Sequence, residues 1–224
     1  MEYKQKDLND LTEAVNHYNQ RGWVEITSYL RRTKVERCRK WLELMNLKRH
    51  ALSDWKGISC VSAHSDILQN LYLSVENWDL SHMLLGTDTV YCFNDQCVVK
   101  NAGDVEMAFA PHCDNQFGTN TDHSIHTVNI MWILDDITEE NGGLAVQDHL
   151  GWRELTPSAG SVVAVRGDIM HASGYNTSDT NRALYACVFT DAPMNMEGYW
   201  NEEFADIHHQ QLVKHPKRNL SQNS

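Results

Sequence analysis

The second half of the chain, from Thr89 onward, contains a series of short apolar or alternating segments separated by turn residues. Such segments are typical of β-strands, and no helical pattern lies between them, so the alternation of strand and helix that builds a parallel sheet is absent. Helical patterns occur only before Thr89. The sequence therefore predicts an α+β fold with a mainly β core, a barrel or jelly roll with helices packed on one side. The expected strands are TVYCF, QCVVK, VEMAFAPH, HTVNIMWIL, GLAVQ, SVVAV and RALYACVF.

Three helices are expected before these strands. Apolar residues recur at intervals of three and four between Leu8 and Tyr18, and Gly22 is placed to end this first helix, after which WVEI forms a short strand. Thr33 and Glu36 fit a capping box that opens a second helix over VERCRKWLELM. A third helix is expected over DILQNLYLSVENWDLSHMLL. We expect residues 1–224 to form a single domain, with the last dozen residues disordered.

Composition and charge exclude several classes of protein. The chain is 42% hydrophobic and 22% charged, and it contains no apolar run that approaches the about 20 residues needed to cross a bilayer. A formal net charge of −11 argues against nucleic acid or an anionic membrane as a partner. The first residues lack the pattern of a signal or transit peptide, and the six cysteines form no CxxC pair. We therefore expect a cytoplasmic protein with free thiols that acts on a small molecule.

One short stretch carries residues that indicate chemistry. In FAPHCDNQFG, His112 and Asp114 lie two positions apart, the spacing at which a strand directs both side chains to one face. His171 follows fifty-nine positions after His112, at the end of another short strand. Two histidines and one carboxylate form a facial triad, which leaves three positions open on an octahedral metal and is typical of non-haem Fe(II) oxygenases. The expected metal ligands are therefore His112, Asp114 and His171.

Arg182 strengthens this interpretation. It begins the strand after the polar loop that follows His171, so an antiparallel return would bring it near the metal but deeper in the barrel. The planar guanidinium binds a carboxylate through two N–H groups and stays charged at any physiological pH. A cosubstrate that chelates iron at one end and carries a carboxylate at the other would need such a residue. 2-Oxoglutarate has this structure.

The HxD motif alone is weak, because the chain contains a second copy at His64 and Asp66. That copy lies at the start of a helical pattern, where Ser65 or Asp66 fits a helix N-cap. For His112 and Asp114 the alternative is a structural hydrogen bond between imidazole and carboxylate. The additional presence of a distal histidine and arginine favours the metal site.

Five motifs occur in an order that resembles the phytanoyl-CoA dioxygenase (PhyH) family over residues 11–192: GWVEITSYL, LLG, HCD, ENGGL and HASGYNTSDTNR. The resemblance implies a double-stranded β-helix. It also implies a dioxygenase that uses O2 and couples oxidative decarboxylation of 2-oxoglutarate to hydroxylation of an unactivated C–H bond. The roles that it implies are iron binding by His112, Asp114 and His171, and 2-oxoglutarate binding by Arg182, Ser173 and Lys100.

Two departures from the family pattern affect the substrate side of the site. The segment QDHL at residues 147–150 stands where the family usually has PGSH, and the middle residue of HxD is Cys113 instead of the common Gln. The carboxylate itself is retained. Because related halogenases replace this carboxylate with Ala or Gly to admit chloride, Asp114 favours hydroxylation over chlorination.

The substrate is expected to be a small amino acid, amine or natural-product intermediate, because the chain has few basic clusters that would bind the phosphates of an acyl-CoA. Two alternatives remain open. The same machinery could perform desaturation, cyclisation or halogenation, or the chain could be a non-catalytic metal-binding sensor or scaffold, which would need no carboxylate clamp such as Arg182. Residues expected at the barrel mouth, each of which could instead lie in the core, are Phe109, Gln116, Trp132, Tyr91 and Tyr185, with His123, His126 and His149 as further candidates.

Overall fold

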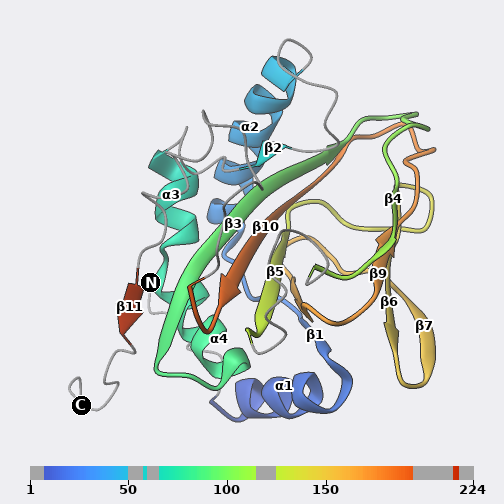
Figure 1. Cartoon of the computed structure of the whole chain (residues 1–224). Coiled ribbons are helices and arrows are strands. Elements are labelled where there is room, and N and C mark those ends of the chain that lie inside the picture. The colour runs from blue at the N-terminus through green and yellow to red at the C-terminus, as the bar shows by residue number, and fades with distance from the viewer. Residues whose placement is uncertain (1–7, 50–57, 60–65, 115–124, 194–213, 217–224) are drawn as a thin grey trace.

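Two antiparallel sheets face each other and form a double-stranded β-helix, as expected (Figure 1). The computed structural model describes residues 8–49, 58–59, 66–114, 125–193 and 214–216. The larger sheet has the strand order β1-β8-β5-β10-β3-β11, with β2 also paired to β3, and the smaller sheet has the order β4-β9-β6-β7. The strands of the larger sheet are β1 (Trp23–Ile26), β2 (Ile58–Ser59), β3 (Thr89–Lys100), β5 (Thr127–Ile133), β8 (Val162–Arg166), β10 (Arg182–Thr190) and β11 (Lys214–Pro216). Those of the smaller sheet are β4 (Phe109–His112), β6 (Leu144–Asp148), β7 (Gly151–Leu155) and β9 (His171–Ser173).

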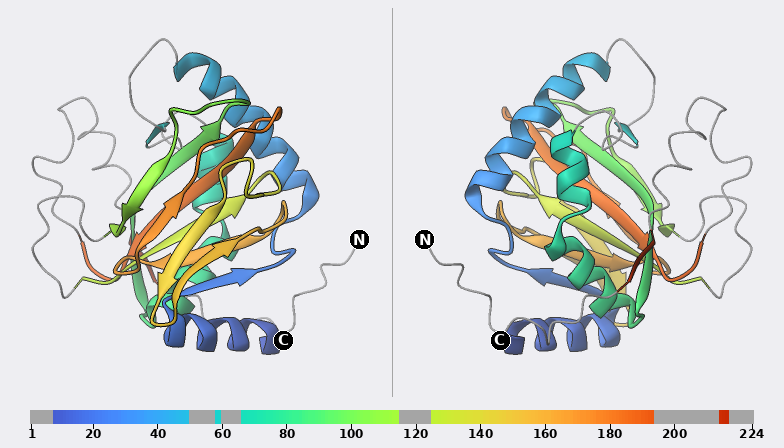
Figure 2. Two further views of the ribbon diagram at one scale, coloured as in Figure 1. Left: turned by 90° about the vertical axis from the view of Figure 1, so that its right-hand side faces the viewer. Right: turned by 90° about the vertical axis from the view of Figure 1, so that its left-hand side faces the viewer.

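Helices cover the face of the larger sheet that points away from the smaller sheet. They are α1 (Leu8–Arg21), α2 (Arg32–Arg49), α3 (Asp66–Tyr72) and α4 (Val75–Leu85). Figure 2 shows α2, α3 and α4 in front of the larger sheet in its right-hand view, and α1 running beneath the sheets. No helix among the described residues is long and apolar enough to span a membrane.

Side-chain alternation along the central strands separates two cores. On β5, Ile130 and Trp132 belong to the core between the larger sheet and the helices, whereas Met131 and Ile133 belong to the core between the two sheets. Because successive side chains point to opposite faces of a strand, Asn129 shares the face of Met131 and points into the barrel. This alternation decides which predicted residues can reach the site.

The first helix and strand agree with their prediction, and the other helices need correction. Gly22 ends α1 with a positive φ of 78°. Thr33 lies inside α2 instead of capping it, so the predicted capping box is wrong. The predicted third helix is two helices, because Ser74 has an extended backbone between them. The Asn77 side chain also donates to the carbonyls of Leu71 and Tyr72 at the end of α3, which stabilises this break.

Several strands also differ from their prediction. TVYCF and QCVVK belong to one continuous strand, β3, because Asn94 and Asp95 pair with β10 beside a bulge instead of forming a turn. His171 begins β9 instead of closing a strand, and β7 was not expected at all. Of the last dozen residues, which were expected to be disordered, Lys214–Pro216 pair with β3 and the others lie outside the described residues. The described cysteines are free, and Cys60 lies outside the described residues.

Candidate metal centre

The three predicted metal ligands converge at one end of the barrel. His112, the last residue of β4, pairs in register with His171, the first residue of β9, and their ring centroids are 4.2 Å apart. The Asp114 Oδ1 atom lies 3.8 Å from His112 Nε2 and 3.6 Å from His171 Nε2. One ligand atom from each residue lies within 4.8 Å of the other two, and the described part of the chain contains no other such cluster of His, Cys, Asp and Glu.

Hydrogen bonds to the backbone fix the orientation of both imidazoles. His112 Nδ1 lies 2.8 Å from the carbonyl oxygen of Ala110, and His171 Nδ1 lies 3.1 Å from that of Ile169. A carbonyl oxygen only accepts hydrogen bonds, so each Nδ1 carries a proton, and the Nε2 atom of each ring is the one that faces Asp114 and is available to a metal. Burial, and then the nearby His171, lower the pKa of His112 and so favour the neutral imidazole that a metal requires. The donor set fits a two-histidine, one-carboxylate metal site.

Two contacts outside this triad hold the segment between its members. The other carboxylate oxygen of Asp114, Oδ2, accepts a hydrogen bond of 2.9 Å from Asn129 Nδ2 on β5. Cys113 Sγ donates to the carbonyl oxygen of Asp168, at 3.4 Å, in the turn that leads to His171. Sequence reasoning missed Asn129, although a single amide in the strand TVNIMWI, which is apolar apart from it and the first threonine, is a signal that could have been used.

A second group of residues lies deeper in the barrel and forms what we call the cation pocket: Lys100, Gly142, Ser173, Gly174 and Arg182. Lys100 and Arg182 are both fully buried. Lys100 Nζ donates to Ser173 Oγ at 2.8 Å and to the carbonyl oxygen of Gly174, and Arg182 Nη2 donates to the carbonyl oxygen of Gly142. The pocket therefore brings together all three residues that the sequence predicts for 2-oxoglutarate.

The guanidinium of Arg182 retains unused hydrogen-bonding capacity. Its Nε and Nη1 atoms are buried and have no hydrogen-bond partner among the described residues. Burial lowers the pKa of Arg182 to about 10, with an opposing contribution from Asp135, so the side chain is charged at neutral pH. A buried cation with unused donors fits an anionic ligand, and the cation pocket is accordingly suited to a carboxylate.

The structure corrects two of the predicted mouth residues. Trp132 and Tyr185 are fully buried in the core beneath the helices, on the opposite face of the larger sheet from the predicted metal ligands. Trp132 Nε1 donates to Asn77 Oδ1 at 2.8 Å, and the Tyr185 hydroxyl donates to Asp95 Oδ2 at 2.6 Å. Buried indole and phenol groups need such partners, so both residues have a structural role.

The remaining candidates differ in their positions. Phe109 is half-buried, its ring centroid 6.2 Å from that of His112 and 5.8 Å from Lys100 Nζ, so it lies between the triad and the cation pocket. The register pairs Tyr91 with Thr190 and Thr190 with Thr127. Because paired residues share a face and side chains alternate along a strand, Tyr91 lies on the same face of the sheet as Asn129.

Gln116 lies outside the described residues, as does His123. The other two histidine candidates, His126 and His149, are exposed. The Nδ1 atom of His126 lies 2.7 Å from Asp191 Oδ2, and His149 lies in the turn after β6.

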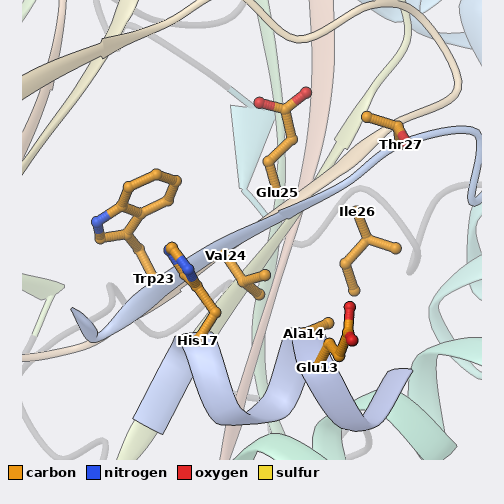
Figure 3. Close-up of a pocket in the computed structure, with 8 residues that line it drawn as sticks. All are labelled: Glu13, Ala14, His17, Trp23, Val24, Glu25, Ile26 and Thr27. Carbon is orange, nitrogen blue, oxygen red and sulfur yellow. The ribbon is translucent and has the colours of Figure 1, made fainter. Parts of the chain in front are cut away.

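A groove of about 560 Å³ lies elsewhere, along β1 and α1, and none of its lining residues belongs to the triad or the cation pocket (Figure 3). Figure 3 shows Glu25 and Thr27 on one side of β1, and Glu13 and Ala14 on the other. The acidic groups of this groove, Glu13 and Glu25, therefore do not point toward one another.

Comparisons with known proteins agree with the fold. The sequence profile described as phytanoyl-CoA dioxygenase (PhyH) matches residues 4–151, which is more than half of the chain and includes His112 and Asp114. A search of curated proteins finds no significant match.

Several solved structures share the fold at low sequence identity. The carbocyclase SnoK from nogalamycin biosynthesis is 21% identical, with 80% of this chain and 83% of that chain covered and a TM-score of 0.71. The epimerase SnoN in complex with Fe3+, alpha ketoglutarate and nogalamycin RO is 17% identical, with coverages of 83% and 85% and a TM-score of 0.70. EctD from S. alaskensis with bound Fe is 17% identical, with coverages of 84% and 79% and a TM-score of 0.68.

Proposed function

The chain belongs to the phytanoyl-CoA dioxygenase family, and from this membership we propose that it is an Fe(II)- and 2-oxoglutarate-dependent oxygenase acting on a small molecule. The observation that carries the proposal is the pairing of two sites in one barrel. A triad with three inward donor atoms lies beside a buried arginine with two unused donors. Among the solved relatives, SnoN is described with iron and alpha ketoglutarate and EctD with iron, which supports the same pair of cofactors here.

Each residue has a defined task in this proposal. Iron would be bound on one face of its octahedral coordination sphere by His112, Asp114 and His171. Arg182 would bind the far carboxylate of 2-oxoglutarate. Lys100 would share in this binding, and Ser173 would fix its ammonium group. When bound, iron and 2-oxoglutarate supply the oxidation, in which dioxygen is consumed and succinate and carbon dioxide are released. Because Lys100 and Arg182 are fully buried, a cosubstrate bound to them would lie away from bulk water.

The reaction that we propose is hydroxylation of an unactivated C–H bond in an amino acid, an amine or a natural-product intermediate. The retained Asp114 supports oxygen transfer over halogenation, since the carboxylate occupies the position that chloride would need. A second outcome is favoured by the activities of the similar solved structures, which include a carbocyclase and an epimerase. Desaturation or cyclisation would lower the substrate mass by two hydrogen atoms, whereas hydroxylation would raise it by one oxygen atom, so product mass separates them.

An anaerobic titration tests the proposal directly. Fe(II) and then 2-oxoglutarate are added to the purified apoprotein, and the visible metal-to-ligand charge-transfer band of the chelate is followed. We expect the band with the unaltered chain, its loss in His171→Ala, and its appearance only at higher 2-oxoglutarate concentration in Arg182→Lys, because an ammonium cannot reproduce the guanidinium fork. The exposed His149→Ala is the matched control and should behave as the unaltered chain. A folded, iron-loaded protein without the band would favour the metal-binding sensor or scaffold.

A further inference from the structure

We propose that Asn129 is a positioning residue that holds Asp114 so that only its Oδ1 atom binds the metal. This inference rests on the proposed function, because it concerns the same metal centre. Asn129 lies on β5, outside the strands that carry the two predicted histidine ligands, and its side chain is hydrogen-bonded to the third predicted ligand, Asp114.

The two oxygens of Asp114 have different surroundings. Oδ1 faces the Nε2 atoms of both histidines, at 3.8 and 3.6 Å, whereas Oδ2 accepts the hydrogen bond from Asn129 Nδ2 at 2.9 Å. An ionised carboxylate only accepts hydrogen bonds, so the amide must present its NH2 group and not its oxygen. This settles the orientation of the Asn129 side chain and commits Oδ2 to it.

Asn129 is itself held rigidly. It lies in the middle of the larger sheet, with Val165 of β8 and Val188 of β10 as its register partners, and its side chain is buried. A side chain on a central strand offers more exact positioning than one on a loop. Asn129 can therefore fix the rotation of the Asp114 carboxylate, which otherwise lies just past the end of β4.

Stability alone does not account for an amide at this position. The Asn129 Oδ1 atom is buried and has no hydrogen-bond partner among the described residues. A buried acceptor without a partner lowers stability, and an apolar residue of similar volume would avoid this cost. An amide at this position can donate the hydrogen bond to Asp114, which an apolar residue cannot do. This difference points to a role of Asn129 at the metal centre.

Holding Oδ2 away from the metal has a chemical consequence. A carboxylate can bind a metal through one oxygen or through both, and the second mode would occupy a further coordination position. A facial triad supports oxygenase chemistry only while the other three coordination positions of the metal remain open. By binding Oδ2, Asn129 keeps Asp114 monodentate and leaves those positions to cosubstrate and dioxygen.

The test measures metal binding instead of turnover. Mn(II) affinity and the visible spectrum of the Co(II) protein are recorded without 2-oxoglutarate for the unaltered chain, Asn129→Leu and the control Met131→Leu, which changes the next residue on the same strand face. In Asn129→Leu we expect Mn(II) affinity to fall about 10- to 100-fold, as is typical when a partner of a metal ligand is lost. We also expect weaker Co(II) visible bands, because coordination number rises when Asp114 binds through both oxygens. Met131→Leu should change neither measurement.

The outcomes separate the inference from the proposed function. If the unaltered chain binds no metal, the proposed function fails and the inference fails with it. If the unaltered chain binds Mn(II) and folded Asn129→Leu binds it within twofold, the inference alone is overturned. A purely structural role would lower the unfolding temperature of the apoprotein and leave the Co(II) spectrum unchanged, which also overturns it. Asn129→Val, which likewise cannot donate and suits a strand, replaces the Leu variant if the latter does not fold.

Discussion

Lys100 and Arg182 are register partners across β3 and β10, and both side chains are fully buried against Gly142. Two cations thus share one pocket inside the barrel. Burial disfavours the charge of a cation, so a carboxylate bound between the two side chains would offset this cost for both. We therefore expect 2-oxoglutarate to stabilise the metal-loaded protein more strongly than it would if it met a single cation.

Replacing Arg182 with lysine should weaken 2-oxoglutarate binding about 10- to 100-fold, the loss expected when one charge-assisted hydrogen bond of about 1.5–3 kcal/mol is removed. The dependence of unfolding temperature on 2-oxoglutarate concentration, measured with Mn(II) bound, gives this affinity. Arg153→Lys is the matched control, because Arg153 contacts Asp148 outside the cation pocket. Equal 2-oxoglutarate affinities in Arg182→Lys and the unaltered chain would contradict the assignment of Arg182.

The backbone of the cation pocket requires glycine at position 142. Gly142 has a φ of +93°, and a Cβ atom there would lie 2.7 Å from Lys100 Cδ and 2.9 Å from the Gly174 carbonyl oxygen. We expect Gly142→Ala to lower the free energy of unfolding by more than about 1 kcal/mol and to weaken 2-oxoglutarate binding, because Lys100 must move. Gly103→Ala is the control: its φ is +69°, but the Cβ would meet nothing within 4 Å. If both variants lose only stability, the pocket tolerates the displacement of Lys100.

Much of the site could be predicted from the sequence because its chemistry depends on residue types with few other uses in combination. The HxD spacing, the distal histidine and the arginine after a polar loop identified residues that the structure brings together. Trp132 and Tyr185 were misplaced because a fully buried strand carries apolar residues on both faces, so its sequence does not reveal which face points into the barrel. Asn129 was missed because its role depends on a contact with Asp114, just past the end of β4, that only the folded chain creates.

The corrected position of Tyr185 leads to a prediction in which stability and activity separate. Tyr185→Phe removes the donor from the buried Asp95 carboxylate, to which the hydroxyl lies 2.6 Å away. We expect the free energy of unfolding to fall by about 1–3 kcal/mol, the usual cost of a buried group that loses a partner. Affinities for Mn(II) and 2-oxoglutarate should not change, since the side chain lies beneath the helices. Tyr175→Phe, at an exposed tyrosine, is the control for stability. Weaker 2-oxoglutarate binding in Tyr185→Phe would contradict the structural role and indicate that Tyr185 contributes to the site.

A last prediction links a turn at the start of the chain to the metal centre. Gly22 ends α1 with a φ of +78°, and a Cβ atom there would overlap the side chain of Ile169. The carbonyl oxygen of Ile169 accepts the hydrogen bond from His171 Nδ1 that orients this ligand. Gly22→Ala should therefore lower the unfolding temperature and also weaken Mn(II) binding, because Ile169 must move and His171 loses its fixed orientation.

Gly86→Ala supplies the matched comparison for this prediction. Gly86 also follows a helix and has a φ of +65°, but a Cβ atom there would meet nothing within 4 Å. The Gly86→Ala variant should lose stability through backbone strain alone and keep its affinity for Mn(II). If Gly22→Ala lost stability to the same extent as Gly86→Ala and bound Mn(II) normally, the turn after α1 would have no influence on His171. A loss of metal affinity confined to Gly22→Ala would instead show that packing beneath the turn before β9 helps to orient the distal histidine.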